Sequence, residues 1–105
     1  MNVVTDFDRL EGLQRYVDQL ERDRGFSHQS LTQQCLLLGE EVGELFKAVR
    51  KQERLRVEVG AKVGSVGEEL ADILIYVCSI ANRLGIDLYG ALQAKEEINK
   101  RRVWT

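Results

Sequence analysis

The amino-acid sequence predicts an all-α protein built from four helices. Proline is absent from the 105 residues, so no residue of that type interrupts a helix. Apolar side chains recur every three or four residues, whereas the alternation typical of strands is hard to find. Residues that cap helices precede the apolar runs. A chain of this length is expected to form one domain over residues 1–105.

The first predicted helix runs from Thr5 to about Arg24. Thr5 and Asp8 have the spacing of a capping box, with Asp in place of the usual Glu or Gln. The apolar residues that follow keep a helical period, with acids and arginines between them. Gly25 is a favourable residue for ending the helix.

The second predicted helix covers about Leu31–Glu53. Ser30 and Gln33 form a second capping box at its start. Gly39 and Gly43 lie in its middle, where each costs about 1 kcal/mol relative to Ala. Because glycine has no side chain, these positions would let a neighbouring helix or a ligand approach closely.

The third predicted helix follows a glycine-containing stretch, Leu55–Gly67, that is expected to be a flexible loop or in part an extension of the second helix. Ser65 and Glu68 have capping-box spacing, and the helix runs to about Arg83. It is apolar nearly all round, which is typical of a helix buried on more than one side. We therefore expect it to lie at a subunit interface. Its outward apolar row is Leu70, Leu74, Cys78 and Ala81.

The fourth predicted helix is capped by Asp87 and continues to about Arg102. Its inward stripe changes from apolar to polar and cationic over the last two turns. The stripe consists of Leu88, Ala91, Leu92, Lys95, Asn99 and Arg102.

Charge and composition exclude several classes of function. Charged residues make up 30% of the chain but the net charge is only −2, so no basic field for nucleic acid and no polybasic membrane patch is predicted. No apolar run approaches the ~20 residues that span a bilayer. Met1 precedes polar residues, so no signal peptide is predicted. Cys35 and Cys78 are expected to be buried thiols in a reducing cytoplasm, with a disulfide as the weaker alternative.

Two acidic motifs lie within the second and third helices. Glu40-Glu41-x-x-Glu44 and Glu69-x-x-Asp72 each place two acids three residues apart, on one helix face. Glu41 and Glu69 fall within apolar stripes, and Glu44 and Asp72 lie at the margins. Burying unpaired carboxylates is very expensive, so a positive charge is expected to meet them.

Each acid also has an ordinary structural explanation. Glu69 stands in the first turn of a helix, where a carboxylate favours the dipole. Glu44 is spaced three residues from Lys47, so the two can pair on a solvated face, and Glu40 can likewise be a solvated acid on this helix. Taken together, however, two antiparallel helices crossing at the motifs would present about four carboxylates to one ion, and oxygen ligands of this kind suit Mg²⁺ or Mn²⁺.

Oxygen-activating di-iron chemistry is disfavoured. That chemistry typically uses Glu-x-x-His on facing helices. The one histidine of the chain, His28, is expected to lie in a loop away from the acidic motifs.

The acidic motifs resemble those of the MazG-like, all-α nucleoside triphosphate pyrophosphohydrolases. The two motifs are separated by 24 residues, and the similarity extends over nearly the whole chain. It includes the run from Asp72 to Tyr76, the pattern Lys95-x-x-x-Asn99-x-x-Arg102 and the first helix.

The resemblance implies a homodimer or homotetramer, dependence on Mg²⁺, with Mn²⁺ as a substitute, and cleavage of NTPs or dNTPs to the monophosphate and pyrophosphate, a reaction suited to nucleotide pool sanitation. Glu40 matches an auxiliary acid, and Lys95 and Asn99 match substrate-contacting positions. Lys51 stands where relatives similar to the eukaryotic dCTP pyrophosphatase carry tryptophan, so no base preference is predicted. The matched metal ligands are Glu41, Glu44, Glu69 and Asp72.

The residue types are consistent with this reaction. A divalent ion neutralises the phosphates and acidifies water. Glu40 or Glu44 is expected to accept the proton of that water. Lys47, Lys95 and Arg102 are expected to stabilise the charge that develops on the leaving pyrophosphate.

Four further residues are expected to contact the substrate or to pack against protein, and for two of them both roles stay open. Asn99 either binds a ribose or phosphate or faces water at a helix end. Tyr76 either contacts the sugar or base or is a core tyrosine with a satisfied hydroxyl. Phe26 is a candidate aromatic wall for the base. Trp104 is expected to pack on a partner subunit.

Two other functions remain open at this stage. One is an enzyme of the same scaffold with another pyrophosphate substrate, such as phosphoribosyl-ATP. The other is a non-enzymatic helical oligomerisation module, whose acids bind metal for stability or pair with the lysines of a partner.

Overall fold

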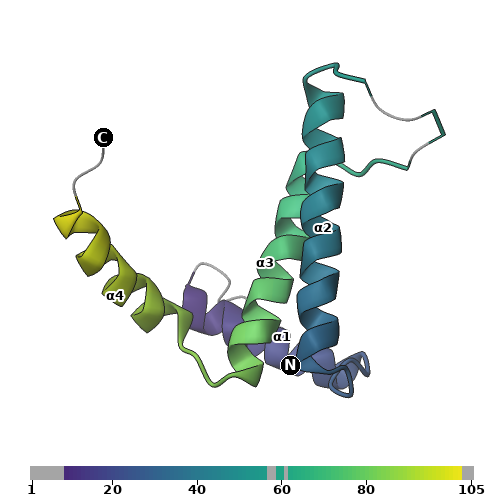
Figure 1. Cartoon of the computed structure of the whole chain (residues 1–105). Helices are drawn as coiled ribbons and strands as arrows, with labels where there is room; N and C mark the ends of the chain where they lie inside the picture. Colours follow the sequence, from purple (N-terminus) through teal and green to yellow (C-terminus); the bar gives the residue numbers. More distant parts are fainter. Residues whose placement is uncertain (1–8, 57–58, 61, 103–105) are drawn as a thin grey trace.

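The computed structural model describes residues 9–56, 59–60 and 62–102, and these form four α-helices and no strand (Figure 1). The predicted all-α class is therefore confirmed. The helices are α1 (Leu10–Asp23), α2 (Leu31–Gln52), α3 (Val66–Arg83) and α4 (Leu88–Arg101). None of them is long and apolar enough to cross a membrane.

Helices α2 and α3 form a long antiparallel pair, and α1 crosses this pair near the C-terminal end of α3 (Figure 1). The small core lies where α1 meets α3. It is built on Val17, Leu20 and Cys78, which are 0%, 7% and 0% exposed. The partly buried residues packed against it are Leu13, Tyr16, Ile75 and Leu88.

Capping explains three of the four helix starts. Ser30 and Gln33 form the complete capping box that the sequence predicts. The side chain of Ser65 accepts a hydrogen bond from the backbone N–H of Glu68, and that of Asp87 accepts one from the N–H of Gly90. These side chains satisfy backbone donors that a helix leaves unpaired in its first turn.

The start of α1 differs from the prediction. The helix begins at Leu10, because Arg9 has extended backbone angles and makes no side-chain cap. The proposed capping box of Thr5 and Asp8 lies outside the described residues. The end of α1 is as expected, since Gly25 adopts a positive φ of 76° just beyond it.

A buried amide fixes the start of α4 to the rest of the chain. Gln14 on α1 donates from Nε2 to Asn82 Oδ1 (3.0 Å) and to the carbonyl of Ile86 (2.9 Å), and its Oε1 accepts from the N–H of Leu88 (2.8 Å). Asn82 donates in return to the carbonyl of Gln14. Three helices are thereby joined through one side chain that is 8% exposed.

The expected outward row of α3 is only half correct. Cys78 and Ala81 are buried, because α1 packs on this end of the helix. Leu70 and Leu74, nearer the start of α3, are 50% and 43% exposed. The expectation of two buried thiols is also wrong for Cys35, which is exposed on α2, although both cysteines are free.

Helix α4 packs mainly on α1 and diverges from the α2–α3 pair (Figure 1). Of its predicted inward stripe, Leu88 reaches the core, but Ala91 is exposed and Leu92 is 53% exposed. Beyond Leu88, the stripe is therefore largely exposed within the described chain. Trp104 lies outside the described residues.

Candidate active site

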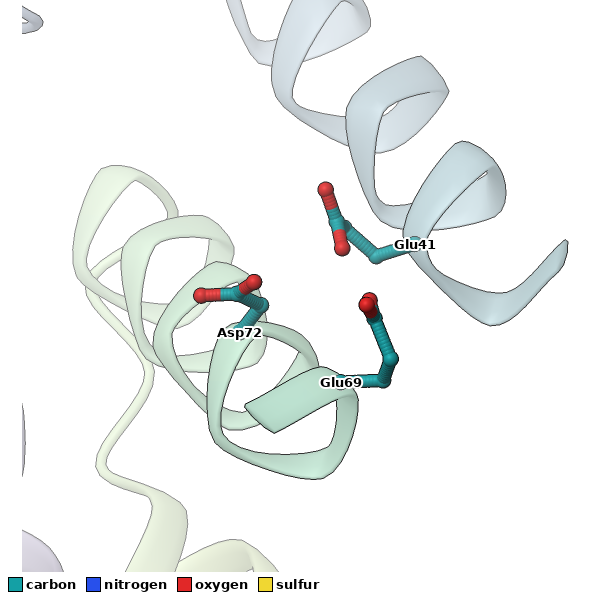
Figure 2. A group of neighbouring side chains, drawn as sticks. All are labelled: Glu41, Glu69 and Asp72. Atoms are coloured by element: carbon teal, nitrogen blue, oxygen red, sulfur yellow. The ribbon is translucent and has the colours of Figure 1, made fainter. Parts of the chain in front are cut away.

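The antiparallel packing of α2 and α3 gathers three of the predicted acids. Glu41 projects from α2 toward Glu69 and Asp72 on α3 (Figure 2). One carboxylate oxygen of each residue lies within 4.8 Å of the others. The i, i+3 spacing of Glu69 and Asp72 places both acids on the helix face that meets α2. The sequence motif thus produces one compact group, which we call the carboxylate triad.

Glu69 is the most buried member of the triad, at 8% exposure. The segment before α3 contributes to this burial, because a Cβ built on Gly64 would collide with Glu69 Oε1. The neighbouring Glu68 has a different role. Its Oε1 lies 3.1 Å from the Ser65 hydroxyl at the helix cap, outside the triad.

Burial and mutual repulsion raise the pKa of Glu41 from 4.5 to about 7. Desolvation is the largest cause, followed by a side-chain hydrogen bond with Glu69 and the negative charges of Asp72, Glu69 and Glu40. The proton on Glu41 thus relieves like-charge repulsion within the triad. A cation placed among these oxygens would have the same effect.

Tyr76 lies one turn after Asp72 on α3 and is half-buried. Desolvation raises the pKa of its hydroxyl, and the negative charges of Glu41, Asp72 and Glu40 raise it further. The hydroxyl therefore stays protonated and can donate a hydrogen bond next to the triad.

Two of the predicted acids lie outside the triad. Glu44 Oε1 is 3.5 Å from Lys47 Nζ, one turn further along α2. Glu40 is exposed, although its charge is felt at Glu41. The assignment of Glu44 as a metal ligand stays a prediction.

A cavity of about 180 Å³ adjoins the triad and shares Asp72 with it. The predicted contacts Phe26 and Tyr76 both line this cavity. Sequence reasoning missed five polar or charged lining residues, which are Glu21, Arg24, Gln29, Gln34 and Ser79. The one signal for them was a polar residue within or beside an apolar run, as Ser79 is between Cys78 and Ile80.

The three predicted contacts on α4 are not brought to the triad within one chain. Lys95 is exposed on a helix whose main packing is with α1, and Arg102 follows the end of that helix. Asn99 donates a hydrogen bond to Glu96 Oε1 on the same helix (3.0 Å). Their roles toward a substrate therefore stay predictions.

The chemistry of the triad fits a hard divalent cation. All three donors are carboxylates, which are the ligands that Mg²⁺ and Mn²⁺ prefer. Burial and then the neighbouring carboxylates raise the pKa of Glu41, and a bound cation would offset the repulsion among the three groups. No histidine or cysteine belongs to the group, so the softer transition metals have no preferred ligand there.

Comparison with known proteins agrees with the all-α fold. Residues 26–103 match the MazG nucleotide pyrophosphohydrolase domain. The chain is also similar to two crystal structures of iMazG from Vibrio DAT 722, the Ntag and Ctag forms, each at 34% identity and a TM-score of 0.62. The similarity covers 88% of this chain and 94% and 98% of those chains, respectively. A search of curated proteins gave no significant match.

The described chain is thus an all-α protein with a carboxylate triad between two antiparallel helices. The chain belongs to the MazG nucleotide pyrophosphohydrolase family.

Proposed function

We propose that the protein is a Mg²⁺-dependent nucleoside triphosphate pyrophosphohydrolase that converts NTPs or dNTPs to the monophosphate and pyrophosphate. The observation that carries the proposal is the triad of Glu41, Glu69 and Asp72 beside a cavity. Membership of the MazG family supports the reaction class. A role in removing unwanted nucleotides in the cytoplasm is consistent with this activity.

Glu41, Glu69 and Asp72 would hold the metal ion, with Glu44 as a fourth ligand. When bound, Mg²⁺ would neutralise phosphate charge and lower the pKa of a coordinated water, and Mn²⁺ is the natural substitute. The half-buried position of Glu41 and the burial of Glu69 strengthen electrostatic interactions at this place relative to bulk water.

Glu40 or Glu44 would accept the proton of the attacking water as the bond between the α- and β-phosphates breaks. Glu40 is exposed and lies outside the triad, so its carboxylate is available. Glu44 lies beside Lys47, with 3.5 Å between Oε1 and Nζ. Lys47 is also placed to stabilise the negative charge of the leaving pyrophosphate.

A homodimer or homotetramer would complete the site. Leu70 and Leu74 on α3 and Leu92 and Ile98 on α4 are between 43% and 53% exposed in the single chain. A closed symmetric assembly is the ordinary way to cover such surfaces. In that assembly Lys95, Asn99 and Arg102 would reach the substrate of a neighbouring subunit.

The decisive experiment measures pyrophosphate release from a panel of NTPs and dNTPs with Mg²⁺, Mn²⁺ or EDTA. The panel includes phosphoribosyl-ATP, the substrate of the alternative activity on this scaffold. We expect metal-dependent turnover of nucleoside triphosphates. Turnover restricted to phosphoribosyl-ATP would select the alternative, and no turnover of any substrate would favour a non-enzymatic metal-binding module.

A further inference from the structure

The cavity beside the triad continues the site along one face of α3. Asp72, Tyr76 and Ser79 are spaced i, i+4 and i+7, and all three line the cavity. At 1.5 Å per residue, the row extends about 10 Å from the triad. A phosphate chain held at the triad would therefore direct the nucleoside end of a substrate into the cavity.

The walls and size of the cavity suit a nucleobase. Leu20, Phe26 and Ile75 provide apolar and aromatic surface, while Gln29, Gln34 and Ser79 provide uncharged polar groups. The charged residues of the lining are Glu21, Arg24 and Asp72. Its volume of about 180 Å³ is below the ~300 Å³ from which ligand pockets usually start, so it would enclose part of a nucleotide rather than all of it. An apolar pocket with a few fixed polar groups is the usual composition of a small-molecule site.

A chain of hydrogen bonds fixes the direction of the polar groups. The hydroxyl of Ser79 donates to Gln34 Oε1 at 3.1 Å, and Gln34 Nε2 donates to Gln29 Oε1. Within the described part of the chain, Gln29 Nε2 has no acceptor, so this amide presents its two hydrogens as the free end of the chain.

The buried position of the first two members couples the orientation of the Gln29 amide to the hydrogen bond that the Ser79 hydroxyl donates. Gln34 and Ser79 are each 2% exposed. Rotating the amide of Gln29 by 180° would set its nitrogen against the Gln34 amide nitrogen and leave a buried donor unsatisfied, which costs about 1–3 kcal/mol. With the Ser79 hydroxyl donating to Gln34, Gln29 is therefore the donor at the cavity end of the chain.

Arg83 fixes the loop that carries Gln29 and Phe26. Its Nη1 donates to the carbonyl of Gln29, and its Nη2 donates to the carbonyl of Phe26 (3.1 Å) and to Glu21 Oε2 (2.7 Å). The guanidinium and its partner carboxylate are only 19% and 11% exposed. Arg83 is therefore a positioning residue for the loop, and it keeps the Gln29 amide at one place on the cavity wall.

We infer that Gln29 is a specificity-determining residue that donates a hydrogen bond to an acceptor atom on the nucleobase. This inference rests on the proposed function, because the ligand class is taken from it. Bases that place a ring nitrogen or carbonyl oxygen at this point are favoured, and bases that place an N–H or amino group there are disfavoured. A fixed donor discriminates in this way because a wrongly matched base leaves polar groups unpaired.

The test uses binding of the four deoxynucleoside monophosphates, measured by titration calorimetry in Mg²⁺, with pyrophosphate as a base-free probe. In Gln29→Met, the dissociation constant of the tightest-binding monophosphate is expected to rise about 2- to 10-fold, the range of one hydrogen bond. The differences in dissociation constant among the four monophosphates become smaller, and the dissociation constant of pyrophosphate is unchanged. Gln52→Met, at the exposed end of α2, is the matched control and should behave as wild type.

Ser79→Ala provides a second test of the fixed direction. This variant removes the Ser79 hydroxyl, which is the first donor of the hydrogen-bond chain, and leaves Gln29 in place. The differences in dissociation constant among the four monophosphates should therefore become smaller, as in Gln29→Met. Unchanged differences in either variant, an equal loss of pyrophosphate binding, or no binding of any monophosphate to the wild type would overturn the inference. Because turnover is not measured, an absence of pyrophosphate release would count against the proposed function alone.

Discussion

The carboxylate of Glu69 occupies the space that a side chain at position 64 would need. A Cβ on Gly64 would lie closer to Glu69 Oε1 than real contacts allow. Gly64 does not have a positive φ, so an alanine there has no conformational penalty of that kind. Steric fit is therefore the reason for this glycine, and Glu69 reaches the triad because of it.

Gly64→Ala is predicted to displace the Glu69 carboxylate and lower both Mg²⁺ affinity and turnover. Residues that orient metal ligands typically contribute 10- to 100-fold, and we expect a loss of about that size. Gly67→Ala is the control, because a Cβ there meets nothing within 4 Å and alanine favours the helix. Steady-state turnover across a Mg²⁺ titration measures the difference. Wild-type activity in Gly64→Ala would show that the Glu69 carboxylate does not need its present position for activity.

Glu41→Gln and Glu69→Gln are each predicted to lower Mg²⁺-dependent turnover by more than about 100-fold, since each removes a proposed metal ligand. Circular dichroism should show unchanged helicity. Removing a charge from a repelling group is also expected to raise the melting temperature of the metal-free protein. Glu68→Gln, which changes an acid outside the triad, should retain activity. Near-wild-type turnover in both triad variants would exclude the ligand assignment.

The raised pKa of Glu41 predicts a pH-dependent stability of the metal-free protein. Its carboxyl has a pKa of 4.5 when unperturbed and about 7 in the folded chain, so the folded state binds the proton more tightly. The resulting stabilisation is fully present below pH 4.5 and is lost as the pH rises to about 7. Urea denaturation in EDTA between pH 4 and pH 8 should therefore show that the free energy of unfolding of the wild type falls as the pH rises. Glu41→Gln should lack this part of the decline. If the free energy of unfolding depends on pH in the same way in the two proteins, the raised pKa of Glu41 is contradicted.

Metal binding is predicted to stabilise the native state. A ligand that binds the folded but not the unfolded chain stabilises the folded state by RT ln(1 + [L]/Kd), so the melting temperature rises with ligand concentration. Calorimetry in millimolar Mg²⁺ or Mn²⁺ against EDTA should show this rise for the wild type and a smaller one for Glu69→Gln. If neither metal shifts the transition, even with a nucleotide present, the triad is not a metal site.

Local signals made most of the fold predictable. Ser30, Ser65 and Asp87 each bind a backbone N–H within one turn, so α2, α3 and α4 begin where the sequence indicates. The i, i+3 spacing likewise predicted that Glu69 and Asp72 would lie together. The start of α1 was not predictable in this way, because Arg9 provides no cap.

The features that were missed depend on contacts between distant residues. An apolar helix has no periodicity that tells which side a neighbour will cover, so the burial of Cys78 and the exposure of Leu74 followed only from the position of α1. The hydrogen bond from Ser79 to Gln34 joins residues 45 positions apart. No spacing rule connects such residues, and the polar wall of the cavity was therefore not expected.

The exposed leucines of α3 predict self-association. Leu70 and Leu74 are 50% and 43% exposed, and full burial of a leucine side chain contributes about 1.5–3 kcal/mol. A small domain has only about 5–15 kcal/mol of stability in total, so covering this surface in a symmetric assembly would add a substantial part of it. Leu74→Glu is predicted to dissociate or unfold the assembly, with activity falling alongside because α4 would no longer reach a neighbouring site.

Light scattering coupled to size exclusion measures this outcome. Val59→Glu is the matched control, since Val59 is fully exposed in the connection between α2 and α3 and a charge there should leave the assembly intact. A shift to monomer in Leu74→Glu but not in Val59→Glu would place the interface on α3. A stable wild-type monomer of 12.0 kDa with full pyrophosphohydrolase activity would contradict both the interface and the contribution of α4 to a neighbour, because Lys95 and Arg102 would then have no substrate within reach.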